Sequence, residues 1–358
     1  MPRLARQDQA EFAAIKRLSY SGLNSIQLRE AVGERLRRYL RADFLSFLAV
    51  DPTTSLPVHA VHDPIPGQCD AAEEKALLVS PAFDYGRRVR DSRRAYFVEQ
   101  LAALGRGDQD PYLREVLLAF GLRHELQVHF VAGGRVWGGL HLCRRTGRDA
   151  FESRSLQLLN AIAPHVAEGL RAAASRAALA ASPGSGIGLV VIGVEGQIEL
   201  ANEVGERFLS QSPAGRVQSH WTVIGTVAGL LSYDREQDHL IPALTVVDEE
   251  RREAYQVRAE QTVGADGRSR RLIFIEPRRA GDHAEALLAL GLTCREAEVA
   301  LAVVRGCTTS QIAANLVISP HTIQDHLRRV FDKLGVRSRR ELAAMLLGAV
   351  AAQRQAPA

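Results

Sequence analysis

The chain has 358 residues, a length that indicates two or three domains rather than one. Its formal net charge is +4, so the chain is only mildly basic and its overall charge alone does not indicate a class of partner. The four cysteines are scattered and have no Cys-x-x-Cys spacing, so the sequence indicates neither a disulfide framework nor a zinc finger.

Membrane and export signals are absent from the sequence. No window reaches the ~18 uninterrupted apolar residues that a membrane span needs. The first six residues, Met1-Pro2-Arg3-Leu4-Ala5-Arg6, lack the apolar core of a signal peptide. We therefore expect a cytoplasmic protein without a membrane partner.

Enzyme motifs are also absent. The sequence has no Gly-x-x-x-x-Gly-Lys-Ser/Thr loop, no Gly-x-Ser-x-Gly elbow and no His-Glu-x-x-His helix. The pairs His59/His62 and His124/His129 do not have the spacing of metal ligands, so we interpret them as core or surface histidines. We expect no enzymatic activity, no catalytic residue and no metal site, while any cofactor and any ligand-binding residue stay unknown.

The first part of the chain alternates helical and strand patterns. Helical patterning covers Phe12–Leu40, and the apolar run Phe44–Val50 predicts a strand. Two more strands are expected at Glu125–Val131 and Val136–Cys143, joined by a hairpin turn at Gly133-Gly134. With helices before and after the strands, this pattern predicts an α+β sheet domain with one face covered.

The end of this first part carries a family resemblance. The segment Gly139-Leu140-x-Leu142 is followed by Phe151 and then by a helical run of apolar residues. In this pattern the first part resembles a GAF domain. The apolar residues of the run are Leu156, Leu158, Leu159, Ile162, Ala163, Val166 and Leu170.

An apolar stripe along the same helix has two interpretations. Its residues alternate spacings of three and four, which is typical of a coiled-coil seam and would make the chain a homodimer. Alternatively, the helix packs the stripe on its own domain, and Pro164 would kink a straight helix there. The stripe consists of Leu156, Leu159, Ala163, Val166, Leu170, Ala173, Ala177 and Ala180.

A second sheet is expected after residue 183. Strands are predicted at Ile187–Val194 and Gln197–Ala201, followed by a short helix over Asn202–Leu209. Two further strands, Ala254–Glu260 and Arg271–Glu276, end the segment. This order of a strand hairpin, a helix and closing strands resembles a PAS domain.

Two breaks divide the chain into segments. Ser182-Pro183-Gly184-Ser185-Gly186 interrupts a helix, and the composition shifts again at Pro277–Asp282. The predicted domains are 1–181, 183–278 and 285–358, and the fold class is α+β: a GAF-like sheet domain, a PAS-like sheet domain and an all-α C-terminal domain.

Start and stop signals mark four helices between Leu292 and Leu347. Thr293, Thr308 and Ser338 are each followed three residues later by Glu or Gln, the spacing of a reciprocal capping box. Ser319-Pro320 marks the start of the third helix, where proline fits the first helical position. Gly306 and Gly335 mark helix ends.

The third of these helices has one apolar and one polar face. Ile323, Leu327, Val330 and Leu334 repeat at helical spacing and are expected inside. The residues from Ser319 to Arg340 include six basic and two acidic side chains. A basic helix face can neutralise phosphates, so we expect this helix, in a helix-turn-helix, to bind double-stranded DNA; a merely solvated face is the alternative.

These helices carry a second, more detailed resemblance. The matching motifs are Leu292-Thr293-x-Arg295-Glu296-x-Glu298-Val299, Gly306-x-Thr308, Ile312-Ala313, Leu316, Ile318-Ser319-x-x-Thr322-Ile323-x-x-His326 and Lys333-Leu334-Gly335-Val336. They resemble the LuxR-type helix-turn-helix of bacterial transcription regulators. The resemblance implies a four-helix domain whose third helix enters the major groove, and it implies RNA polymerase as a partner.

The resemblance also implies which residues contact DNA. Gln324, Asp325 and Arg328 occupy the positions that approach base edges, and their side chains suit adenine, cytosine and guanine respectively. An orienting role for Asp325, by repulsion from the DNA backbone, is an alternative. Contacts to the DNA backbone are expected from residues at helix starts and from two basic residues: Thr308, Thr309, Ser310, Ser319, Thr322, Arg329 and Lys333.

Two functions follow from this organisation. In the first, the chain is a sequence-specific DNA-binding transcriptional regulator, a dimeric one-component sensor in which a small-molecule effector or a partner changes the placement of two recognition helices. In the second, it is a protein–protein sensor module whose DNA-binding domain is always competent and recruits a partner. The sequence leaves the signal, the operator and the direction of regulation open.

Overall fold

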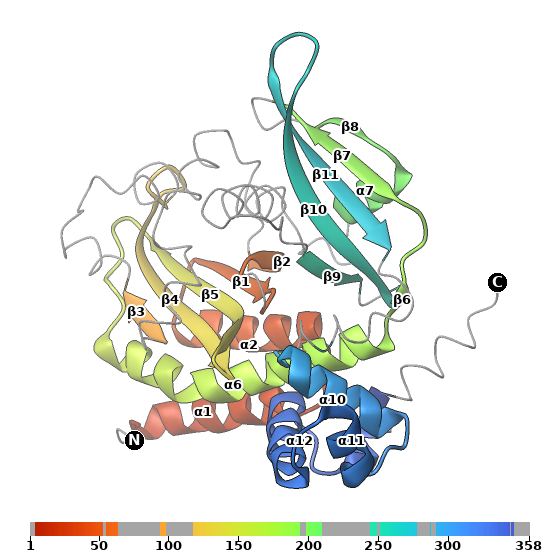
Figure 1. The fold of residues 1–358 in the computed structure, drawn as a ribbon. Helices are drawn as coiled ribbons and strands as arrows, with labels where there is room; N and C mark the ends of the chain where they lie inside the picture. Colours follow the sequence, from red (N-terminus) through yellow and green to blue (C-terminus); the bar gives the residue numbers. More distant parts are fainter. Residues whose placement is uncertain are drawn as a thin grey trace. The chain divides into compact units, whose positions relative to one another are not determined.

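The computed structural model describes residues 4–52, 55–63, 94–97, 117–193, 198–209, 244–248, 251–277, 287, 291–343 and 345–346. They form two sheets with helices and a helical C-terminal region, so the α+β class is confirmed (Figure 1). The backbone separates into two compact units. The predicted boundary between residues 278 and 285 lies outside the described residues, and the three-domain division stays a prediction.

Two helices precede the first sheet. The predicted helical stretch is in fact divided into α1 (Arg6–Ser19) and α2 (Ser25–Tyr39). Gly22 separates them with φ +80°, a conformation that glycine adopts without strain. Asn24 then caps α2, because its side chain accepts from Gln27 N at 2.8 Å and Gln27 Oε1 accepts from Asn24 N in return.

The first sheet has five strands in the order β2-β1-β5-β4-β3. The predicted strands are present as β1 (Phe44–Val50), β4 (Leu122–Ala132) and β5 (Arg135–Arg145). The hairpin between β4 and β5 turns at Gly133 and Gly134, both with positive φ, as a two-residue turn requires. The sequence did not predict β2 (Pro57–Asp63) or β3 (Ala95–Phe97).

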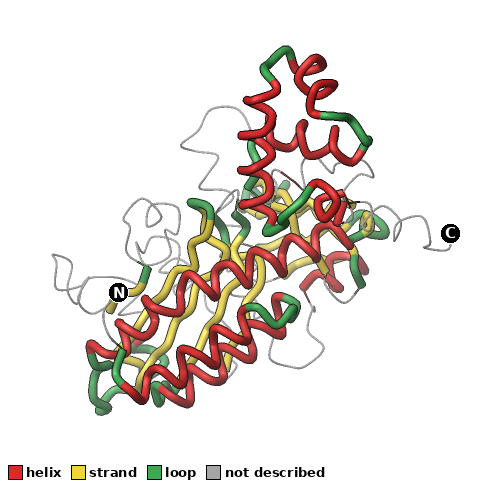
Figure 2. Tube along the Cα trace, turned by 90° about the horizontal axis from the view of Figure 1, so that it is seen from below, coloured by secondary structure: helices red, strands yellow, loops and turns green. Residues whose placement is uncertain are grey.

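A long helix, α6 (Ser153–Ala180), follows this sheet and contains Pro164. Helices α1, α2 and α6 lie along one face of the sheet (Figure 2). A Cβ added at Gly138 of β5 would lie only 2.8 Å from Leu170 of α6, so the helix and strand are in close contact. Leu159, Ala163 and Val166 of the stripe are buried. The middle of the stripe therefore packs on its own domain, and the coiled-coil dimer stays a prediction.

The second sheet has the strand order β6-β10-β11-β7-β8, with β9 paired to β10. The predicted elements are present, with shifted ends, and residues 194–197, between the first two strands, lie outside the described residues. Asn202 caps α7 because its Oδ1 accepts from Gly205 N at 2.9 Å. The elements are β6 (Ser182–Pro183), β7 (Gly188–Ile192), β8 (Ile198–Ala201), α7 (Glu203–Leu209), β9 (Leu244–Asp248), β10 (Glu253–Val263) and β11 (Ser269–Pro277).

The C-terminal region contains α10 (Cys294–Val304), α11 (Thr309–Leu316) and α12 (Pro320–Leu334). Residues 339–343 and 345–346 are also helical. Each of the four predicted starts is capped, and Gly306 and Gly335 have positive φ as predicted. None of the described helices is long and apolar enough to cross a membrane.

One predicted cap differs in detail. Ser338 Oγ accepts from Glu341 N at 3.1 Å, which is half of the predicted capping box. The Glu341 carboxylate accepts from Arg337 N at 2.8 Å instead of from Ser338 N. The acidic side chain therefore still satisfies a backbone donor at the helix start, one residue earlier than predicted.

Candidate DNA interface

The helix α12 separates its two faces as the sequence predicts. Ile323, Leu327, Val330 and Leu334 are buried, and they hold the helix against α10 and α11. Gln324, Asp325, Arg328 and Arg329 are exposed on the other side. The polar face is therefore available to a partner while the apolar face fixes its orientation.

The three predicted base-reading residues lie within one stretch of α12. Gln324, Asp325 and Arg328 are exposed, and Asp325 and Arg328 are separated by one helical turn. Asp325 Oδ2 lies 3.9 Å from His321 Nε2, one turn earlier on the same helix. An amide, a carboxylate and a guanidinium on one surface offer both donors and acceptors to base edges.

The hydroxyl groups predicted to hold phosphate have partners within the domain. Ser319 Oγ accepts from Thr322 N at 3.1 Å and lies 2.9 Å from Thr322 Oγ1. Thr308 Oγ1 accepts from Gln311 N at 3.3 Å, while Ser310 is exposed in the first turn of α11. These hydroxyls cap α11 and α12, so both helices begin with backbone amides at the surface.

Lys333 differs from the other predicted phosphate contacts. Its Nζ lies 2.5 Å from Glu296 Oε2, and the lysine side chain is only partly exposed. Burial raises the pKa of the Glu296 carboxyl, but the hydrogen bonds from Lys333 and from the backbone of Thr293 outweigh it and leave the pKa lower than usual. Any phosphate bound by this ammonium group would have to share it with Glu296.

The turn between α11 and α12 consists of Val317, Ile318 and Ser319. Val317 has φ +55° and ψ +44°, the left-handed conformation that β-branched residues avoid. Its side chain is 89% exposed, so no packing compensates for the strain. Arg295 of α10 stabilises the turn by donating to Leu316 O at 2.8 Å.

Arg339 connects the fourth helical stretch to the start of α11. Its Nη1 donates to Thr309 Oγ1 at 2.9 Å, and its Nη2 donates to Cys307 O at 2.5 Å. In the sequence, Arg339 is recognisable only as one of the six basic residues between Ser319 and Arg340. Its role depends on a contact across 30 residues, which no local pattern reveals.

Comparison with known proteins identifies this region. A model of the family described as bacterial regulatory proteins, luxR family, matches residues 290–346. The spore germination protein GerE of Bacillus subtilis (strain 168) is 41% identical over 56 residues, which cover 16% of this chain and 76% of GerE. The chain belongs to the luxR family of bacterial regulatory proteins. This is a family of DNA-binding transcriptional regulators rather than an enzyme class.

Two further similarities are more limited, one because it covers a small part of the other protein and one because its sequence identity is low. The probable transcriptional regulatory protein SgaR of Hyphomicrobium methylovorum is 44% identical over 54 residues, and the match spans 15% of this luxR-family chain but only 26% of SgaR. The phycoerythrobilin-bound GAF domain of a cyanobacterial phytochrome is 14% identical, with a TM-score of 0.33, over 46% of this chain and 97% of that domain.

A metal centre is not found in the part of the chain that the structure describes. No group of three or more His, Cys, Asp or Glu side chains there is arranged to hold a metal ion. His62, His129 and His141 are buried in the first sheet. His62 and His129 are therefore at buried rather than surface positions, the two alternatives that the sequence left for them.

Proposed function

We propose that this luxR-family chain is a sequence-specific DNA-binding transcriptional regulator that reads the major groove with α12. The exposed polar face of α12, opposite its buried apolar face, carries this proposal. A helix of this kind fits the major groove, where each base pair presents a distinct set of donors and acceptors. Such a protein works in the cytoplasm of a bacterium, and RNA polymerase is the partner that the resemblance implies.

Each exposed residue of α12 has a separate role in this proposal. The Gln324 amide pairs with adenine, the Arg328 guanidinium with guanine N7 and O6, and the Asp325 carboxylate accepts from cytosine N4. Arg329 and the capped starts of α11 and α12 hold phosphate oxygens, which fixes the register on the duplex without specifying its sequence. Lys333 keeps α12 attached to α10 through Glu296.

The reading face is tested with DNA from upstream of the chain's own and adjacent genes. Footprinting identifies a site, and fluorescence anisotropy then measures affinity for that site and for a scrambled duplex. Arg328→Ala should reduce the ratio of the two affinities by about 5- to 150-fold, since one bidentate contact to a base gives ~1–3 kcal/mol of discrimination. Arg305→Ala, at an exposed position at the end of α10, is the matched control. Full specificity in Arg328→Ala would contradict the assignment.

We further propose that the regulator is a homodimer whose sensory part responds to a small molecule. Two copies of α12 would read half-sites about one helical turn apart, so a change in their separation would change affinity. Light scattering gives the mass of the protein free and bound to DNA, and anisotropy with and without metabolites from a cell extract tests the response. A monomer on DNA, or an affinity that no extract changes, would contradict this part and favour a constitutively DNA-competent module.

A further inference from the structure

One register row of the first sheet consists entirely of polar or aromatic-hydroxyl side chains. Ser46 of β1 lies opposite His62 of β2 on one side and His141 of β5 on the other. Gln127 of β4 lies opposite His141 and also opposite Tyr96 of β3. These five residues, called the polar row below, cross all five strands, and all five are buried.

The adjacent register row has the opposite character. It contains only apolar side chains on the same five strands: Val61, Phe47, Leu140, Val128 and Ala95. Successive residues of a strand point to opposite faces, so the two rows lie on opposite faces of the sheet. The apolar face packs on helices: a Cβ added at Gly33 of α2 would lie 3.5 Å from Phe47 Cδ1. The polar row is therefore not needed to hold the helices.

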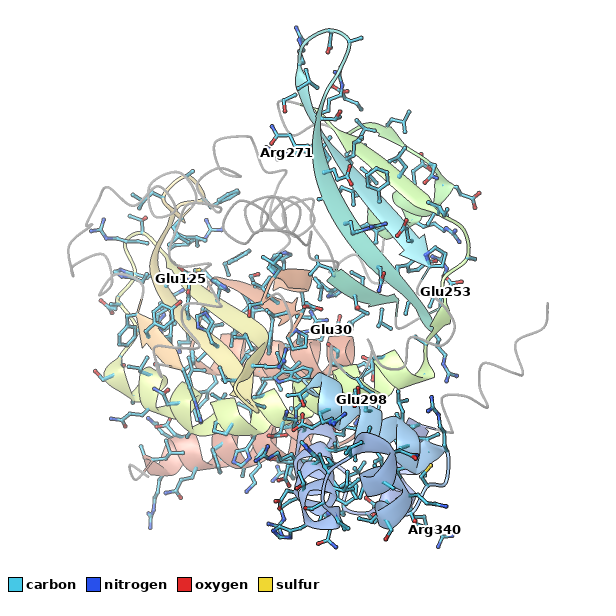
Figure 3. The ribbon with its side chains drawn as sticks, in the orientation of Figure 1. Glu30, Glu125, Glu253, Arg271, Glu298 and Arg340 are labelled. Atoms are coloured by element: carbon cyan, nitrogen blue, oxygen red, sulfur yellow. The ribbon has the colours of Figure 1, made fainter. Side chains whose placement is uncertain are left out.

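The polar face contains an ionisable pair beside the row. Glu125 of β4 is fully buried, and its Oε1 lies 2.7 Å from His141 Nδ1. Figure 3 labels Glu125 on β4. The Tyr96 hydroxyl donates to Gln127 Oε1, which turns that oxygen toward β3. The amide nitrogen of Gln127 is buried and has no hydrogen-bond partner in the described part of the chain.

Burial of these groups costs free energy that a packing role would not require. A buried amide donor without an acceptor, such as that of Gln127, costs ~1–3 kcal/mol. The buried Glu125 carboxylate is paired with His141, and the desolvation of such a pair can exceed its attraction. Apolar side chains of similar volume would stabilise the sheet better. Polar groups gathered at such a cost are typical of a binding site.

Ring contacts bound the row at both ends. Phe44 and His62 are stacked with their centroids 6.1 Å apart on the β2 side. Tyr96 and His129 are 5.5 Å apart on the β3 side. Between these rings lie the carboxylate and imidazole of Glu125 and His141 and the amide of Gln127. A small flat molecule can lie with one face against one of these ring pairs while its edge meets the central polar groups.

We propose that the polar row, with Glu125, binds a small, uncharged, planar molecule that carries adjacent hydrogen-bond donor and acceptor groups, such as a cyclic amide. The Gln127 amide nitrogen donates to its carbonyl oxygen, and Glu125 accepts from its ring N–H. A free anion is disfavoured because it would face the Glu125 carboxylate. The inference deepens the proposed function, because this molecule would be the effector of the regulator.

Calorimetry on the full chain tests the proposal with 2-pyridone, uracil and hypoxanthine, three planar cyclic amides. Toluene and pyridine are the matched rings without an adjacent donor and acceptor. At least one amide should bind saturably while the two control rings do not. Absence of binding by all three amides, or equal binding by toluene, would overturn the proposal.

Variants locate the binding site. Gln127→Leu and Glu125→Gln should each weaken amide binding by about tenfold or more. Gln127→Leu removes the donor, and Glu125→Gln replaces one of two acceptor oxygens with a donor, so that His141 and the ligand N–H compete for the oxygen that is left. Leu126→Met, on the same strand but the opposite face, should leave binding unchanged. Circular dichroism shows whether each variant folds. Glu125→Gln keeps the side-chain volume, so it remains a test of the site if Gln127→Leu does not fold. Unchanged binding in folded Glu125→Gln would overturn the proposal.

Measuring both amide binding and DNA binding separates failure of the polar-row proposal from failure of the proposed function. Arg328→Ala should bind the amide as the unmodified chain does while losing its DNA specificity. DNA binding without amide binding would overturn only the inference drawn from the polar row. Amide binding without specific DNA binding would contradict the proposed function and leave the site standing.

Discussion

Lys333 of α12 donates to Glu296 Oε2 of α10 at 2.5 Å, and the same oxygen accepts from Thr293 N at 2.7 Å. One carboxylate therefore caps the first helix of the domain and holds the last turn of the third. The recognition helix is attached to the domain at its C-terminal end by this ion pair, while its N-terminal half presents the base-reading residues.

Removal of the carboxylate should loosen α12. Glu296→Gln keeps the cap geometry but loses the ion pair, which we expect to cost ~2 kcal/mol, the usual contribution of a hydrogen bond to a charged group. Hydrogen exchange of α12 amides should accelerate about thirtyfold, because 1.4 kcal/mol corresponds to a factor of ten. Glu298→Gln, an exposed glutamate on the same helix, is the control. Equal exchange in the two variants would show that the pair contributes nothing.

The stability of the first sheet should depend on pH through His62. Burial, together with the smaller effects of the His141 and Arg29 charges, lowers the pKa of His62 from 6.5 to about 4. The unfolded chain therefore binds a proton that the folded chain excludes between pH 6.5 and about 4. The contribution of the buried, neutral His62 to the free energy of unfolding is fully present above pH 6.5. It is lost as the pH falls from 6.5 to about 4.

Thermal unfolding measures this effect. Between pH 7 and pH 5 the His62 contribution should fall by ~2 kcal/mol, at 1.36 kcal/mol for each pH unit below the ordinary pKa of a histidine. His62→Gln cannot titrate and should lose less stability over the same range. The unmodified chain and the variant are compared at each pH, so that the titration of other groups cancels. Parallel stability curves would contradict the assignment to His62.

How far the sequence predicted the fold depends on whether a signal is local. The helix caps at Thr293, Thr308 and Ser319 were predicted because each depends on residues three apart. The alternation of Glu125, Gln127 and His129 with apolar residues also fits a strand, but such a pattern is typical of a sheet with one face in water. The structure buries both faces. The polar row was missed because its members meet only through strand pairing.

The left-handed conformation of Val317 predicts a stabilising substitution. Val317→Asn places a residue that tolerates positive φ at an exposed position where valine gains nothing from packing. We expect a gain of ~1 kcal/mol in the stability of the helix-turn-helix, measured by hydrogen exchange of α11 and α12. Val317→Ile retains the β-branch and should give no gain. A loss of stability in Val317→Asn would contradict the strain assigned to this conformation.

The two classes of DNA contact should separate by their salt dependence. Gln324→Ala should relax specificity at one base position and leave the salt dependence of affinity unchanged. Arg329→Ala should weaken binding to every duplex alike and reduce the slope of log affinity against log salt by about 1. Anisotropy titrations at several salt concentrations, with the specific and the scrambled duplex, measure both effects. An unchanged slope in Arg329→Ala would place Arg329 away from phosphate.

Arg339 should act on DNA binding through the start of α11. Its guanidinium holds Thr309 Oγ1 and Cys307 O, so it fixes the orientation of the helix start that we propose to contact phosphate. Arg339→Met keeps most of the side-chain length but removes both hydrogen bonds, and affinity should fall by about tenfold for specific and scrambled DNA alike. Arg340→Met, at the exposed neighbouring position labelled in Figure 3, removes the same charge without those bonds. If only the charge mattered, the two variants would bind DNA with equal affinity. If Arg339 orients α11, Arg339→Met binds DNA more weakly than Arg340→Met. Hydrogen exchange in Arg339→Met is then faster only at the start of α11.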